Sequence, residues 1–276
     1  MRLAKRWGQT TGVPDWLTAT LLGIIEGITE FLPISSTGHL LLSQQLGWLE
    51  PQSDVFNIAI QSGAVIAVLF NFTDRVKQLT FRWREPAARD YLAKLFVAFV
   101  ITGAGGLVID QLGFELPEDV LPVAVALLVG GVLFVVVENK IGDQANLAEV
   151  TWAIAIAVGF GQLLAAVFPG TSRSGATILI ALLMGLRRVP AIEFTFLLGV
   201  PTLLAAGAYK VFKAVRAESL SEDWGQLILA TGVSAITAFV SVRWLLRYIE
   251  THTFVAFGWY RIALGLTLIV YLIAFE

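Results

Sequence analysis

Residues 23–39 read GIIEGITEFLPISSTGH, a group of polar side chains within a strongly apolar chain. Glu26 and Glu30 are four residues apart, so on a helix they lie on one face. Pro33 lacks an amide hydrogen and is expected to end that helix. Ser35 then occupies the N-cap position of a second helix. The stretch predicts a broken helix whose break is lined by hydroxyls and free backbone N–H groups.

The composition indicates that this break lies in a membrane. The 276 residues are 57% hydrophobic and 14% charged, with a mean hydropathy of +0.76, whereas soluble domains contain about 25% charged residues. Within a bilayer, broken helices occur only against protein or a water-filled cavity, so the break is a binding site by default. The net charge is −2 and no basic surface suggests nucleic acid. We expect a single integral membrane domain over residues 1–276, without a cleavable signal peptide.

The chain contains an internal repeat. Apolar segments of spanning or near-spanning length occur at about 17–32, 36–48, 55–72, 92–109, 120–137, 151–168, 173–186, 192–209, 226–246 and 256–274. Two pairs of short segments are broken at Pro33 and Pro169, and a shift of 136 positions superimposes the two prolines. The same shift places Gly23 on Gly159, Glu26 on Gln162, Ser35 on Thr171, Ser36 on Ser172 and Gly63 on Gly199. A constant offset indicates a duplication.

The repeat predicts the fold class. Repeat 1 covers about 17–137 and repeat 2 about 151–274, each with one re-entrant helical hairpin and three transmembrane helices. Three crossings are an odd number, so the second repeat enters the membrane from the opposite side. We therefore predict an all-α polytopic membrane protein with an inverted-topology repeat, whose two broken hairpins meet near the midplane.

The loop charges predict the orientation. The side that holds the loop Arg75–Lys94 has eleven lysines and arginines in our assignment, against six on the opposite side. Positive loops face the cytoplasm, which puts both termini and the first hairpin on the outer side.

Buried charges point to a site for an anion. Glu26, Glu30 and Arg173 each cost about 2.5–3.5 kcal/mol at the centre of a bilayer, so they are expected to face one another or water. Residues 168–176, FPGTSRSGA, combine small residues, a helix start and a guanidinium, which together suit a phosphate group. The alternative is a purely structural Glu–Arg lock, to which clustered serine, threonine and glycine would add nothing.

Ser36 and His39 are three residues apart and share a helix face. A serine beside a base is the arrangement of nucleophilic catalysis, although a lone membrane histidine also serves in packing. Gln61 is as well explained by polar packing as by substrate contact. We expect Tyr260 and Arg261 to be ordinary interfacial anchors. The remaining predicted substrate-binding residues are Ser35, Thr37, Gly38, Gly170, Thr171, Ser172, Ser174 and Gly175.

The two motifs resemble those of the bacterial undecaprenyl-diphosphate phosphatase family linked to bacitracin resistance, over essentially the whole chain. The resemblance implies hydrolysis of the cell-wall lipid diphosphate in the bacterial inner membrane. The orientation predicted from the loop charges puts the site open to the periplasmic face. The resemblance also implies a divalent cation, Mg²⁺ or Ca²⁺, which Glu26 or Glu30 would hold. The activity-linked residues of the family match Glu26, Glu30, Ser36, His39 and Arg173.

Several alternatives stay open at this point. Ser36 is our expected nucleophile, with His39 or Glu30 as its base, but His39 or a metal-activated water could attack instead. Inverted repeats with broken helices are also typical of transporters, so a transporter or flippase of a phosphorylated prenyl lipid is the alternative function. The expected partners are a prenyl diphosphate lipid and membrane lipids, with no nucleic acid; the sequence allows a homodimer without fixing the oligomeric state.

Overall fold

The computed structural model describes residues 12–113, 119–141, 145–216 and 222–275. Over these ranges the chain is helical, and its only β-type pairing is an isolated bridge between Leu147 and Leu186. The helices, in chain order, are α1 (Asp15–Thr29), α2 (Ser36–Gln45), α3 (Asp54–Asn71), α4 (Thr73–Phe81), α5 (Pro86–Gln111), α6 (Val120–Ile141), α7 (Trp152–Val167), α8 (Arg173–Leu183), α9 (Arg188–Arg216), α10 (Trp224–Thr251) and α11 (Val255–Phe275).

Helix length separates two groups. In the described ranges, six helices are long and apolar enough to cross a membrane, namely α3, α5, α6, α9, α10 and α11, which have 18 to 29 residues. Helices α1, α2, α7 and α8 have 15, 10, 16 and 11 residues, or about 15–24 Å at 1.5 Å per residue. They are shorter than the hydrocarbon core of about 30 Å. The chain is an all-α, multi-pass membrane protein, as predicted, and α4 is an additional helix in the basic loop.

Both breaks differ in detail from the prediction. Helix α1 ends at Thr29, before Pro33, because residues 30–34 form turns rather than a last helical turn. Helix α2 begins after Ser35, as predicted, whereas α8 begins after Ser172 rather than Thr171. The second break has one more residue than the first between its proline and its cap, and Gly170 adopts a left-handed φ of 90° there. The offset between the repeats is therefore 136 at the prolines but 137 at the helix caps.

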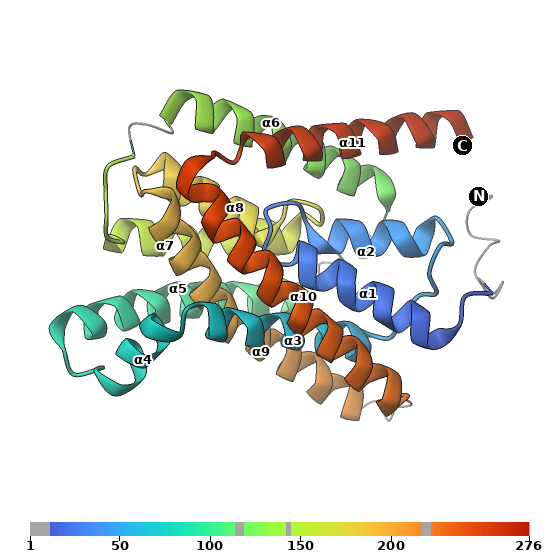
Figure 1. Cartoon of the computed structure of the whole chain (residues 1–276), viewed down its shortest axis with the longest axis horizontal. Helices are drawn as coiled ribbons and strands as arrows, with labels where there is room; N and C mark the ends of the chain where they lie inside the picture. The colour runs from blue at the N-terminus through green and yellow to red at the C-terminus, as the bar shows by residue number, and fades with distance from the viewer. Residues whose placement is uncertain (1–11, 114–118, 142–144, 217–221, 276) are drawn as a thin grey trace.

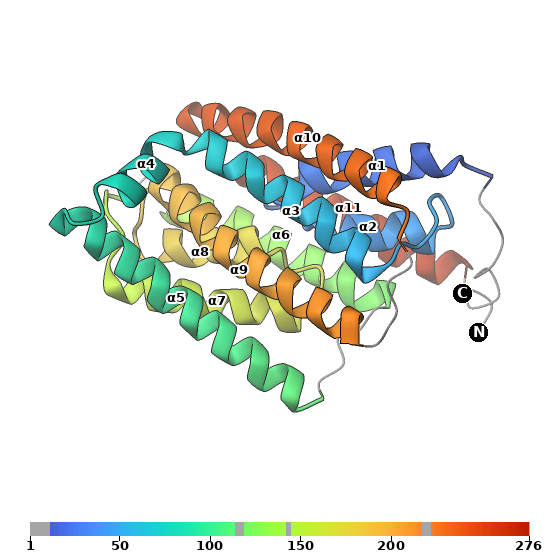
Figure 2. The ribbon, with the colours of Figure 1, turned by 90° about the horizontal axis from the view of Figure 1, so that it is seen from below.

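Glycines let the helices around the breaks approach closely. Helices α6 and α11 lie side by side (Figure 1), and α10 runs along both α1 and α3 (Figure 2). A Cβ at Gly27 of α1 would lie 2.5 Å from the carbonyl oxygen of Ser234 on α10, and one at Gly63 of α3 would lie 2.3 Å from that of Thr231. Small residues at such contacts are typical of packed membrane helices.

The apolar residues of the first loop anchor it in the core. Phe31, Leu32 and Ile34 are buried in one hydrophobic cluster, in which the rings of Phe31 and Phe196 lie 4.9 Å apart between centroids. Because these side chains face the core, the polar residues on either side of them are held at a fixed place inside the helical assembly.

Candidate active site

Two serines in strained backbone conformations are the N-caps of the short helices α2 and α8. Ser35 and Ser172 have φ values of 74° and 69°, a region that costs about 1–3 kcal/mol for a residue other than glycine. Each hydroxyl accepts a hydrogen bond at 3.2 Å from a backbone N–H three residues later, at Gly38 and Gly175. The same cap geometry in both motifs brings two helix N-termini, which attract anions, to one cavity.

That cavity has a volume of about 130 Å³. Its polar lining comes from both motifs and from α3, and all of these residues were predicted: Glu30, Ser35, Ser36, Thr37, Gln61, Gly170, Ser172 and Arg173. Ala165, Pro169 and Leu203 complete the wall. The predicted residues that lie outside the lining are Glu26, Gly38, His39, Thr171, Ser174 and Gly175.

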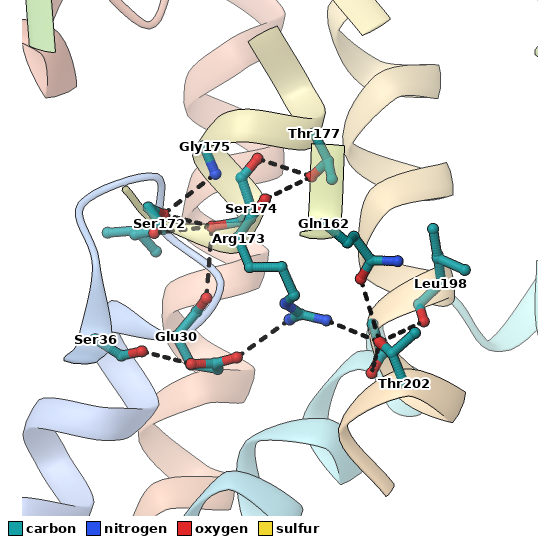
Figure 3. A network of polar contacts seen from close by, with 12 residues as sticks. Glu30, Ser36, Gln162, Ser172, Arg173, Ser174, Gly175, Thr177, Leu198 and Thr202 are labelled. Atoms are coloured by element: carbon teal, nitrogen blue, oxygen red, sulfur yellow. Dashed lines mark hydrogen bonds and ion pairs between the residues drawn. The ribbon is translucent and has the colours of Figure 1, made fainter. Parts of the chain in front are cut away.

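Glu30 joins the two motifs (Figure 3). The Ser36 hydroxyl donates to Glu30 Oε2 at 2.6 Å, and Arg173 Nη2 donates to Glu30 Oε1 at 3.1 Å. The side chain of Glu30 is 6% exposed and that of Arg173 is 17% exposed. Ser174 adds a second bridge, since its hydroxyl bonds to the carbonyl oxygen of Leu32 at 3.2 Å. A hydroxyl, a carboxylate and a guanidinium are thus in direct contact across the two breaks.

Helix α9 positions the Arg173 side chain. Arg173 Nη1 donates to the Thr202 hydroxyl at 3.4 Å, and Thr202 is within 3.3 Å of Gln162 Oε1. A Cβ at Gly199 would lie 2.3 Å from Arg173 Nη1, so only glycine leaves room for the guanidinium. Arg173 Nε is buried without a hydrogen-bond partner, and this free donor suits an incoming anion.

Glu26 differs from Glu30 in having a carboxylate without any hydrogen bond. It is fully buried, and neither of its carboxylate oxygens has a hydrogen-bond partner; its charged neighbours are Glu30 and Arg173. The described residues contain no group of three or more His, Cys, Asp or Glu side chains that could hold a metal by themselves. Mg²⁺, however, is commonly bound through one or two carboxylates together with waters and substrate phosphates. The unsatisfied oxygens beside Glu30 fit such a cation.

His39 faces away from Ser36 in its hydrogen bonding. Its Nδ1 lies 2.7 Å from the carbonyl oxygen of Ser35, and its Nε2 lies 2.6 Å from the hydroxyl of Tyr260. Since a carbonyl only accepts, Nδ1 carries the hydrogen and Nε2 of the neutral ring accepts from Tyr260. The carboxylate in contact with Ser36 is that of Glu30; Glu30 and His39 were the two bases that the sequence left open.

The interface prediction for Arg261 was wrong. Its side chain is fully buried, and it donates to backbone carbonyls of both breaks and of α6. Thr202 was also missed, because nothing in the sequence marks a threonine inside an apolar helix. Gln162 had a signal, namely its alignment with Glu26 in the repeat.

These features define a class of protein: an integral membrane protein with a polar site enclosed between the N-termini of two short helices. The chain belongs to the bacitracin resistance protein BacA family, whose model matches residues 19–267. It is 51% identical over 257 residues to an undecaprenyl-diphosphatase of Rhizobium etli (strain CIAT 652), covering 92% of this chain and 96% of that protein. It is 47% identical over 260 residues to one of Xylella fastidiosa (strain 9a5c), covering 94% and 99%.

Proposed function

We propose that this site hydrolyses undecaprenyl diphosphate to undecaprenyl phosphate and inorganic phosphate, and so recycles the lipid carrier of cell-wall synthesis. Family membership and relatives of that name over more than nine-tenths of the chain place the protein among the undecaprenyl-diphosphatases. The observation that supports the chemistry is the direct contact of Ser36 and Arg173 with the two oxygens of Glu30.

The chain would act as an inverted repeat, with α1–α2 and α7–α8 as re-entrant hairpins. Related contacts in the two halves support this. Helix α1 packs on α10 and α7 packs on α5. The Thr237 hydroxyl is 3.4 Å from the carbonyl oxygen of Gly23, and the Thr102 hydroxyl is 3.2 Å from that of Gly159. With the basic loop in the cytoplasm of a bacterial inner membrane, the cavity would open to the periplasmic side while the prenyl chain stays in lipid.

Ser36 would attack the terminal phosphorus of the diphosphate. Its Oγ forms the new P–O bond, its proton passes to Glu30, and the bond to the bridging oxygen breaks to release undecaprenyl phosphate. Glu30 would pass this proton to the departing undecaprenyl phosphate. Water would then cleave the phosphoserine: Glu30 would take a proton from the water and return it to Ser36 Oγ as that P–O bond breaks, and inorganic phosphate would leave. Arg173 and the N-termini of α2 and α8 would stabilise the charge on the transferred phosphoryl group, which supplies most of the catalysis in such reactions.

The histidine route is less well supported by these contacts. Both ring nitrogens of His39 are occupied, by Ser35 and Tyr260, and neither bonds to Ser36. His39→Gln is therefore expected to retain more activity than Ser36→Ala, and the covalent phosphate is expected to be acid-stable, as phosphoserine is. An acid-labile phosphohistidine would select His39, and the lack of any covalent intermediate would select a water nucleophile.

A divalent cation would be held by Glu30 together with Glu26, whose carboxylate oxygens have no hydrogen-bond partner. When bound, it would neutralise oxygens of the diphosphate. Glu30 lines the cavity whereas Glu26 does not, so Glu30 is the carboxylate that substrate and cation would share.

The test is phosphate release in detergent, where no second compartment exists. Purified protein is expected to release phosphate from undecaprenyl diphosphate. A protein that only transports or flips a phosphorylated prenyl lipid would release none, and that result would refute the proposal.

A further inference from the structure

Arg261 on α11 is the largest fully buried side chain in the described part of the protein. It donates four hydrogen bonds, and each acceptor is a backbone carbonyl oxygen rather than a carboxylate. Burying an ionised group is costly unless it is well hydrogen-bonded, so a cation satisfied wholly by carbonyls has a demanding and specific geometry.

Two of the acceptors are equivalent residues of the two breaks. Arg261 Nη1 donates to the carbonyl oxygen of Pro33 at 3.2 Å, and Nη2 donates to that of Gly170, also at 3.2 Å. Pro33 lies two residues before the cap Ser35, and Gly170 lies two residues before the cap Ser172. Each terminal nitrogen of a single planar fork thus binds the same position in each loop.

The other two bonds fix the guanidinium itself. Arg261 Nε donates to the carbonyl oxygen of Leu127 at 3.4 Å, and Nη2 also donates to that of Ala126 at 3.1 Å, both on α6. A Cβ at Gly130 would lie 2.1 Å from Nη2, so this glycine provides the space that the fork occupies. Helix α6 therefore serves as the fixed support from which Arg261 holds the two loops.

We propose that Arg261 is a positioning residue, which sets the separation and direction of the N-termini of α2 and α8 around the cavity. It lies behind the cavity wall and does not line it, so its effect passes through the two loops. The expected effect of Arg261 on catalysis rests on the proposed function. The expected effect of Arg261 on the geometry of the two loops does not. Lysine has one nitrogen on a flexible stem and does not reproduce a two-pronged contact.

The test combines a distance measurement with kinetics. The chain has no cysteine, so spin labels can be attached through Trp48→Cys beyond α2 and Leu183→Cys at the end of α8, at residues 66% and 52% exposed. Arg261→Lys is expected to broaden the distribution of label-to-label distances. It is also expected to lower kcat by about 10- to 100-fold, because a misplacement near 1 Å has such an effect, while KM changes by less than about threefold.

Arg188→Lys is the matched control. Arg188 forms a largely buried ion pair with Glu138 at 2.6 Å and does not line the cavity. It is expected to lower thermal stability with the distance distribution and kcat unchanged. Equal effects of both lysine variants, or an unchanged distance distribution in Arg261→Lys, would overturn the proposal.

A second variant keeps the proposal testable if Arg261→Lys does not fold. Gly130→Ala retains Arg261 but displaces its Nη2, and it is expected to broaden the same distances. If neither Arg261→Lys nor Gly130→Ala folds while Arg188→Lys does, Arg261 supports the whole fold and the positioning role is refuted. If the wild type releases no phosphate, the proposed function fails, and the label distances still decide whether Arg261 holds the loops.

Discussion

Gly199→Ala changes the site without removing any of its functional groups. The added methyl would lie 2.3 Å from Arg173 Nη1, whereas real Cβ contacts are essentially never shorter than 3.0 Å. The guanidinium therefore has to move by at least about 0.7 Å. This movement is directed away from α9, where Thr202 holds Nη1, and it disturbs the 3.1 Å contact with Glu30.

Gly199→Ala is expected to lower the rate of catalysis much more than the stability of the fold. A misplacement near 1 Å can lower the rate about 100-fold, which corresponds to about 2.7 kcal/mol of transition-state stabilisation. Alanine has a higher helix propensity than glycine by about 1 kcal/mol, which offsets part of the strain on Arg173. We therefore expect kcat/KM to fall about 100-fold while the unfolding temperature changes by only a few degrees.

The assay is phosphate release from undecaprenyl diphosphate in detergent, with thermal unfolding measured on the same samples. Gly232→Ala is the control, because it makes the same change within α10 and its Cβ meets no atom within 4 Å. If Gly199→Ala kept wild-type kcat/KM in a folded protein, the claim that Arg173 acts from its present position would be refuted.

Four further outcomes follow from the contacts of the site. Ser36→Ala is expected to lower kcat by at least about 1,000-fold. Ser43→Ala, at a buried serine of the same helix whose hydroxyl donates to the Leu40 carbonyl oxygen at 2.8 Å, is expected to keep activity; equal rates would exclude the serine route. Glu30→Gln is expected to abolish turnover and to destabilise the fold by about 3–5 kcal/mol, because Arg173 loses its charged partner; chemical denaturation measures this. Glu138→Gln, which affects a buried pair away from the cavity, is expected to lower stability by a similar amount while the kcat of the folded fraction stays unchanged. Removing divalent cations with a chelator is expected to stop phosphate release, and Mg²⁺ to restore it; turnover that survives chelation would contradict a cation held by Glu30.

The sequence was sufficient for the apolar helices, though not for α4 in the basic loop, and it indicated one long-range contact. The apolar segments and the Ser35 cap follow from local patterns. The cost of burying charge predicted that Glu26, Glu30 and Arg173 face one another or water, and the structure pairs Glu30 with Arg173 across 143 positions. Few carboxylates are available to an arginine within the membrane, so few ion pairs could lower the cost of burying Arg173. The role of each residue in the reaction remains a prediction.

The other contacts of the site could not be predicted, because they depend on the angles and positions at which the helices pack. Arg261 stands at the start of an apolar helix, where an interfacial arginine is the ordinary interpretation, and only the packing of α11 on α6 turns its side chain inward. Tyr260 precedes it and faces His39 instead. The extra residue between Pro169 and the cap Ser172 was also missed, because an alignment at a constant offset does not allow an insertion.

The contacts between the halves explain why the site needs both of them. Glu30 of the first half bonds to Arg173 of the second, and Ser174 of the second bonds to the carbonyl oxygen of Leu32 in the first. Arg261 adds the fork that binds one loop of each half. Each half alone would leave a charge or a carbonyl group unsatisfied in an apolar environment, which is costly. The hydrogen bonds that would form the catalytic site are therefore the same bonds that join the two halves.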